Sequence, residues 1–119
     1  MKTLLYIFIG GGAGSILRYL VAKFSLQYLH ENLPFGTIIA NVLASLVLGF
    51  ITVKTMHSPQ VWKPMIAVGF CGGFSTYSTF SNETFALLQS GQYGVAGMNA
   101  LLNLVFCLAA IGLGMFLGR

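Results

Sequence analysis

The chain has 119 residues, of which 56% are hydrophobic and only 7% charged, and its mean hydropathy is +0.84. A soluble domain carries about 25% charged residues, so this composition excludes a soluble globular protein and predicts a single all-α membrane domain over residues 1–119. The net charge of +4 comes from six basic and two acidic residues, which are too few and scattered for a nucleic-acid-binding surface.

Four segments are predicted to be membrane-spanning helices, because a span needs roughly 20 apolar residues. They cover approximately residues 3–29, 34–56, 61–89 and 93–117, and polar residues interrupt the third near residues 72–80. The connections are short, so neighbouring helices must alternate in direction. We therefore expect the two termini on the same side of the membrane.

The basic residues predict the orientation only weakly. Lys23 marks the membrane side opposite the termini, and Arg18 leans the same way. Four basic residues fall on the side of the termini: Lys2, Lys54, Lys63 and Arg119. The positive-inside rule then favours cytoplasmic termini, but with a bias small enough to permit insertion both ways round.

The first helix contains a glycine-rich run, residues 10–14, followed by Arg18. The run lies within an apolar span and follows no strand, so close helix packing explains it better than phosphate binding. An arginine near the membrane centre costs about 2.5–3.5 kcal/mol. Arg18 lies roughly 22 Å along the helix from Thr3, so it either extends its side chain to the interface or lies at an anion entrance.

The second helix presents Thr37, Asn41 and Ser45 on one side, because residues four apart share a helix face. Asn41 lies in the middle of this span. One interpretation is a hydrogen bond between helices, worth about 0.6 kcal/mol on average. The other is an amide donor directed into a pore, which the neighbouring hydroxyl groups favour.

The fourth helix carries a similar stripe of Asn99, Asn103 and Cys107. The same two interpretations apply, and here hydrogen bonding between helices is favoured. Cys71 and Cys107 both lie in apolar runs and are expected to be free thiols. With the histidines they form no recognisable metal-binding set.

The third segment contains residues 72–81, which are too rich in glycine, serine and threonine for an ordinary span. Two glycines cost roughly 1 kcal/mol each within a helix, so Gly72 and Gly73 predict a break. Carbonyl groups freed there suit a cation, and the start of a second half-helix favours an anion. A hydroxyl between Ser78 and Ser81 is expected to cap that half-helix. The alternative is a continuous helix whose hydroxyls bond to their own backbone.

Two aromatic rings and one acid extend this segment. Tyr77 and Phe80 are three residues apart, and both can direct the positive edge of the ring to one place. Ser78 and Thr79 place hydroxyl groups between them. Glu83 is either a partner for the helix dipole or a functional acid within the membrane. No set of nucleophile, base and orienting residue is present, so an enzyme is not expected.

Three stretches together resemble the CrcB/Fluc family of fluoride channels, and their order and spacing extend the likeness over essentially the whole chain. They are residues 10–19 (GGGAGSILRY), 34–41 (PFGTIIAN) and 69–81 (GFCGGFSTYSTFS). The resemblance implies a four-helix subunit with a broken third helix, paired as an antiparallel, dual-topology homodimer with two pores. It also implies a multi-pass protein of the inner or plasma membrane that passively exports cytoplasmic fluoride.

The resemblance also implies roles for particular residues. A structural sodium ion is expected on the backbone carbonyls of Gly72 and Ser75. The pore asparagine corresponds to Asn41, the paired pore aromatics to Tyr77 and Phe80, and further polar residues of the pathway to Thr37, Ser78, Thr79, Glu83, Arg18 and Cys107. Three positions depart from the usual family pattern, in which phenylalanine, glycine and serine are expected: Tyr77, Ala44 and Cys107.

Fluoride is small and strongly hydrated, so its dehydration must be offset by many donors. Hydroxyls, an amide and ring edges do this without the full positive charge that suits other anions. One alternative is a small multidrug-type cation exporter, which needs an acid in the first helix, and residues 1–30 contain none. A second is a membrane subunit that packs on a larger complex without transporting anything.

Overall fold

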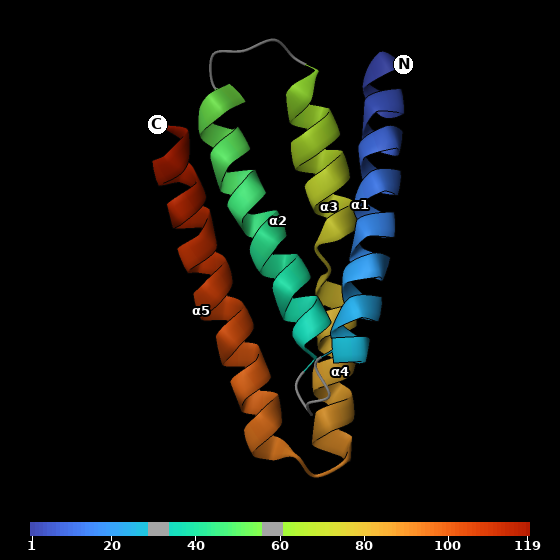
Figure 1. Cartoon of the computed structure of the whole chain (residues 1–119), viewed down its shortest axis with the longest axis vertical. Helices are drawn as coiled ribbons and strands as arrows, with labels where there is room; N and C mark the ends of the chain where they lie inside the picture. The colour runs from blue at the N-terminus through green and yellow to red at the C-terminus, as the bar shows by residue number, and fades with distance from the viewer. Residues whose placement is uncertain (29–33, 56–60) are drawn as a thin grey trace.

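The computed structural model describes residues 1–28, 34–55 and 61–119, and within these ranges every regular element is a helix. The elements are α1 (Lys2–Tyr28), α2 (Phe35–Lys54), the π-helix η2 (Lys63–Phe70), α3 (Cys71–Phe74), α4 (Tyr77–Gln89) and α5 (Tyr93–Gly118). They form an elongated bundle of 49 × 28 × 23 Å, with both chain ends at the same end of the bundle (Figure 1).

Three of the described helices, α1, α2 and α5, are long and apolar enough to cross a membrane. Their described bounds lie within two residues of the predicted ends, of which residues 29 and 56 lie outside the described residues. The expectation of an all-helical, multi-pass membrane protein is therefore confirmed. The remaining segment, residues 63–89, is divided among η2, α3 and α4 and so contains no single long helix.

The π-helix was not predicted from the sequence. It spans eight residues, with Pro64 in its first turn, and passes directly into α3. Such wide turns are rare in proteins and occur most often near functional sites. Here the π-helix packs along α1 and leads the chain to the polar run.

Glycine allows α1 to pack closely against η2 and α3. A Cβ atom added at any of four positions would overlap main-chain atoms of the facing helix: Gly10, Gly14, Gly69 and Gly73. Close packing is thus the role of the glycine-rich run, as its small-residue spacing predicts. The second close pair is α2 with α5, where Gly49 and Gly114 meet the facing backbone in the same way.

The buried core of the single chain is small. Among the described residues its main cluster is formed by Ala40, Ala44, Cys71 and Phe74, packed where α2 meets α3. Ala44 is only 2% exposed, so its methyl group fills core space. Most large apolar side chains of α1 and α5 point outward, and α4 buries no residue. These outward faces suit contact with lipid or with another membrane helix, because lipid is as apolar as the side chains.

Candidate functional site

The site is organised around two extended residues, Ser75 and Thr76, which separate α3 from α4. The Ser75 N–H and Oγ both donate to the Cys71 carbonyl, at 2.9 and 2.7 Å, and close the last turn of α3. The Thr76 Oγ1 accepts a bond of 3.2 Å from the Thr79 N–H and caps α4. Hydroxyl groups that bond to nearby backbone compete with the helical ladder and so favour this interruption.

This geometry corrects two expectations. The helical path is interrupted at Ser75 and Thr76, inside the predicted range of residues 72–80, but not at Gly72 and Gly73, which both lie within α3. Gly73 is small because a Cβ atom there would meet the Gly11 carbonyl. The cap of α4 is Thr76, upstream of the predicted range 78–81. The backbone-bonding capacity of serine and threonine favours this position, whereas Gly73 serves packing.

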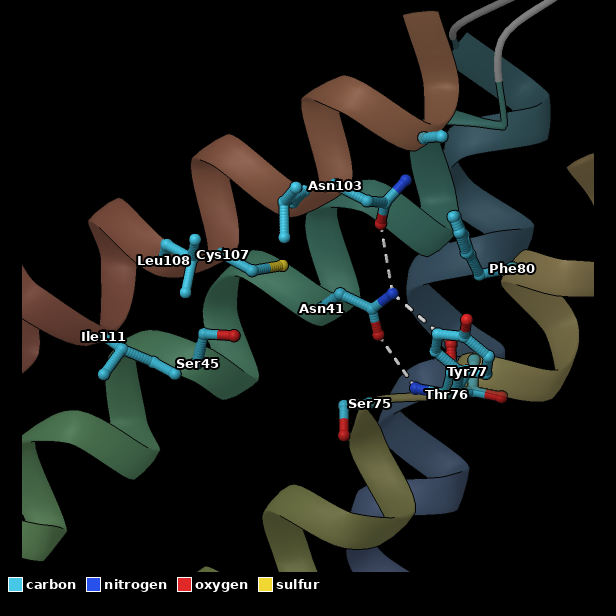
Figure 2. Close-up of a pocket in the computed structure, with 12 residues that line it drawn as sticks. Asn41, Ser45, Ser75, Thr76, Tyr77, Phe80, Asn103, Cys107, Leu108 and Ile111 are labelled. Atoms are coloured by element: carbon cyan, nitrogen blue, oxygen red, sulfur yellow. Dashed lines mark hydrogen bonds between the residues drawn. The ribbon is translucent and has the colours of Figure 1, made fainter. Parts of the chain in front are cut away.

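Asn41 joins α2 to this interruption. Its Oδ1 accepts a bond of 2.8 Å from the Thr76 N–H, and its Nδ2 lies 3.4 Å from the Thr76 carbonyl (Figure 2). The same Nδ2 donates to the Asn103 Oδ1 of α5 at 3.2 Å. Asn41 therefore makes the hydrogen bond between helices that one interpretation expects. It also faces a cavity, as the other interpretation requires.

That cavity has a volume of about 470 Å³ and lies between α2, α5 and the start of α4 (Figure 2). Its polar lining comes from amide, hydroxyl and thiol groups, and none of the described residues that line it carries a charge. The polar residues are Asn41, Ser45, Ser75, Thr76, Asn103 and Cys107, facing an apolar wall of α5. Cys107 is a half-buried free thiol.

The two aromatic rings lie at one edge of this cavity. The ring centroids of Tyr77 and Phe80 are 5.6 Å apart, and the rings are tilted by 56°. Tilted rings direct an edge rather than two parallel faces toward a neighbour. Tyr77 is 82% exposed in the single chain, so most of its ring lacks cover from the described residues.

A second cavity of about 290 Å³ lies between α1, α2 and α4 and is lined by Arg18, Thr37, Thr76 and Thr79 among others. Thr37 Oγ1 donates to the Glu83 Oε1 at 2.5 Å, which fixes the acid beside this cavity. Among the described residues, Thr76 is the one lining residue that the two cavities have in common.

A third, smaller cavity of about 150 Å³ is bordered by Gly72 and Ser75. It shares Ser45 and Ser75 with the largest cavity. The structure thus brings most of the predicted site residues together around one interruption. Two predicted residues, Ser78 and Glu83, border none of the three cavities. The Ser78 hydroxyl lies 3.3 Å from the Thr76 hydroxyl, and Glu83 is joined to the site by its hydrogen bond from Thr37.

Sequence reasoning missed three contributors. Thr76 was only one hydroxyl in a run, yet it caps α4, bonds Asn41 and borders two cavities. Asn103 was assigned to helix packing, yet it also lines the cavity. Thr84 bonds Asn99 at 2.9 Å and was not singled out. The available signal was the four-residue spacing of Asn99 and Asn103. This spacing predicts that both lie on one face of α5, but it does not predict which residues of the other helices they contact.

Together these features define a class: a multi-pass helical membrane protein whose main polar cavity, lined by no charged residue, lies at an interrupted helical segment. Irregular backbone at membrane depth is tolerated where protein or a cavity surrounds it, and such sites hold ions or substrates in channels and transporters.

Comparison with known proteins identifies the family. The family described as CrcB-like protein, Camphor Resistance (CrcB), matches residues 5–115, and the chain belongs to this family. This confirms the resemblance seen in the sequence. The family is one of membrane channels rather than enzymes.

Three relatives carry the name fluoride-specific ion channel FluC. The protein of Shewanella amazonensis is 44% identical over 116 residues, covering 96% of this chain and 94% of its own. That of Coxiella burnetii (strain CbuK_Q154) is 39% identical and covers 98% of both chains. That of Pyrococcus abyssi is 38% identical and covers 100% of this chain and 98% of its own.

Proposed function

We propose that this chain is a subunit of a fluoride-selective channel that lets cytoplasmic fluoride leave the cell passively. The observation that carries the proposal is the cavity of about 470 Å³, which gathers an amide, hydroxyls, a thiol and two aromatic rings without any charged lining residue. The names of the relatives, which specify fluoride, support the same function.

The chemistry of the cavity suits a small anion that has lost water. Amide and hydroxyl groups donate hydrogen bonds, and the edges of Tyr77 and Phe80 add weak positive charge. Conduction requires binding that is favourable enough for entry and weak enough for release. Arg18 draws anions into the outer cavity of about 290 Å³, and Thr76, which borders both cavities, passes them to the ring pair.

We further propose that η2, α3 and α4 together make the third crossing and that two subunits pair antiparallel. The exposed Tyr77 ring and the absence of buried residues on α4 support a second copy that completes the pore walls. The two copies then enclose two pores. Insertion in both orientations agrees with the weak charge bias, and the inner or plasma membrane is the proposed location.

The interruption also fits a structural sodium ion. In a continuous helix, the carbonyls of Gly72 and Ser75 would accept from the N–H groups of Thr76 and Thr79. Those N–H groups instead donate to the Asn41 Oδ1 and the Thr76 Oγ1. Unwound carbonyls of this kind are typical sodium ligands in membrane proteins. Two carbonyls are too few for one ion, so the same pair from a second copy would complete the set.

Removal of sodium should therefore weaken the dimer. When sodium exceeds its dissociation constant a hundredfold, it should add about 2.7 kcal/mol of stability. The measurement is thermal unfolding of the purified protein in sodium chloride and in N-methylglucamine chloride at equal ionic strength. Equal stability in the two salts would remove sodium from the proposal.

The cation exporter gains no support. Its first helix needs an acid, and α1 contains none. Glu83 accepts a hydrogen bond from Thr37 beside a cavity that also holds Arg18. That cavity presents a positive group and hydroxyls, which favour an anion.

The function is tested by flux from liposomes. Vesicles that contain the purified protein and internal fluoride should release fluoride rapidly when valinomycin balances the charge with potassium. Vesicles loaded with chloride should release it far more slowly, and vesicles without protein serve as the control. The absence of fluoride release, or the release of an ethidium-type cation instead, would refute the proposal.

A further inference from the structure

A continuous series of hydrogen bonds connects the interruption to α4 through two buried asparagines. Asn41 donates to Asn103 at 3.2 Å, and Asn103 donates to the Asn99 Oδ1 at 3.1 Å. Asn99 donates to the Thr84 Oγ1 at 2.9 Å, and Thr84 donates to the Phe80 carbonyl at 2.8 Å. Asn99 and Asn103 are 0% and 7% exposed, so these bonds are shielded from bulk water.

The direction of the series is fixed at both ends and also at Asn103, whose Nδ2 donates to the Asn99 main-chain carbonyl at 2.9 Å as well. It begins at the Thr76 N–H, which can only donate, so the Asn41 Oδ1 must face it. It ends at the Phe80 carbonyl, which can only accept, so the Thr84 hydroxyl must donate there. Each amide between these ends has one orientation that satisfies its neighbours. Reversal of any amide would leave a buried donor or acceptor unpaired, at about 1–3 kcal/mol.

This direction determines which atoms Asn41 offers to the cavity of about 470 Å³. Its oxygen is occupied by the Thr76 N–H at 2.8 Å, whereas one amide hydrogen makes only the long contact of 3.4 Å with the Thr76 carbonyl. An anion can accept a hydrogen bond from that N–H with the smallest loss of existing hydrogen bonding. Figure 2 shows the Asn41 amide held between Asn103 and the Thr76 backbone.

We propose that Thr84, Asn99 and Asn103 are positioning residues that hold the Asn41 amide as a hydrogen-bond donor toward the permeating anion. The proposal rests on the proposed fluoride function and adds a structural cause for the preference for anions. A freely rotating amide would present its oxygen part of the time and repel fluoride. A role in helix packing alone would differ from this one. Packing requires neither a fixed direction of the hydrogen bonds nor a hydroxyl group at residue 84.

Thr84 offers the sharpest test, because it lies outside the three cavities and outside direct reach of the ion. Thr84→Val keeps the shape of the side chain and removes the hydroxyl, whereas Thr84→Ser keeps the hydroxyl. In the liposome assay Thr84→Val should lower fluoride flux about tenfold, the effect of one lost hydrogen bond to the ion. Thr84→Ser should retain flux, and both variants should keep the dimer on size-exclusion chromatography.

Full flux through Thr84→Val, or an equal loss of flux in Thr84→Val and Thr84→Ser, would overturn this inference. The proposed function would still stand in that case, because the wild-type protein conducts fluoride. Absence of wild-type flux would instead refute the proposed function and this inference with it.

A second measurement covers the case in which Thr84→Val does not assemble. In wild-type protein labelled with ¹⁵N-asparagine, the side-chain amides of Asn99 and Asn103 should exchange with D₂O at least about tenfold more slowly than that of the exposed Asn82. Fluoride should shift the Asn41 amide resonance. Exchange of Asn103 as fast as that of Asn82, or an unshifted Asn41 resonance, would overturn the inference.

Discussion

Asn41→Asp is expected to lower fluoride flux about a hundredfold, because a like charge beside an anion costs several kcal/mol. The chain should still fold. The carboxylate retains an oxygen that accepts from the Thr76 N–H, as the Asn41 Oδ1 does at 2.8 Å. It lacks the N–H groups that Asn41 directs to Asn103 and the Thr76 carbonyl. Fluoride efflux from liposomes and the thermal unfolding midpoint should be measured on the same preparation.

Asn82→Asp is the matched control for this change. Asn82 is exposed on α4 and borders none of the three cavities, and the substitution adds the same charge. Its flux should resemble wild type. Near-normal flux through Asn41→Asp would remove Asn41 from the ion path and leave it a packing role. Equal loss in the two variants would show that charge alone, wherever it lies on the subunit, causes the effect.

Phe80→Ile is expected to lower flux roughly fivefold while the dimer persists, because a ring contact is worth on the order of 1 kcal/mol and each tenfold step about 1.4 kcal/mol. Isoleucine fills similar apolar space but offers no positive ring edge. It also removes the tilted contact with Tyr77, whose ring centroid lies 5.6 Å away. Flux should be measured with a fluoride electrode, and assembly by size-exclusion chromatography.

Phe85→Ile is the control on the same helix. Phe85 is 59% exposed and borders none of the described cavities, so the same chemical change there should leave flux unaltered. Unchanged flux through Phe80→Ile would place the ring outside the pore. Loss of the dimer in Phe80→Ile alone would assign the ring to assembly rather than to ion contact.

Much of the fold was available from the sequence because membrane helices obey simple rules. Long apolar segments with few charges predicted the described bounds of α1, α2 and α5 to within two residues. Small residues at four-residue spacing predicted the close packing of α1. The π-helix at residues 63–70 was not predictable, since its wide turns depend on how α1 and η2 fit together rather than on a local residue pattern.

The site was predicted in composition but not in geometry. The hydroxyl run, Asn41 and the ring pair were all identified, and the interruption lies within the expected range of residues 72–80, but Gly72 and Gly73 were expected to cause it and Ser75 and Thr76 form it. Local propensity identifies glycine as a helix breaker. The structure keeps both glycines helical and ends the helix where hydroxyl groups, together with Asn41, satisfy the exposed backbone.

The sequence alone determined that this protein lies in a membrane and which residue types are present at its polar centre, because hydropathy and helical spacing are local properties. Only the tertiary structure decided which polar groups face one another. The bond from Thr76 to Asn41 joins residues 35 positions apart, and that from Asn41 to Asn103 joins residues 62 apart. Hydrogen-bond direction follows from such contacts, which no pattern within a single helix encodes.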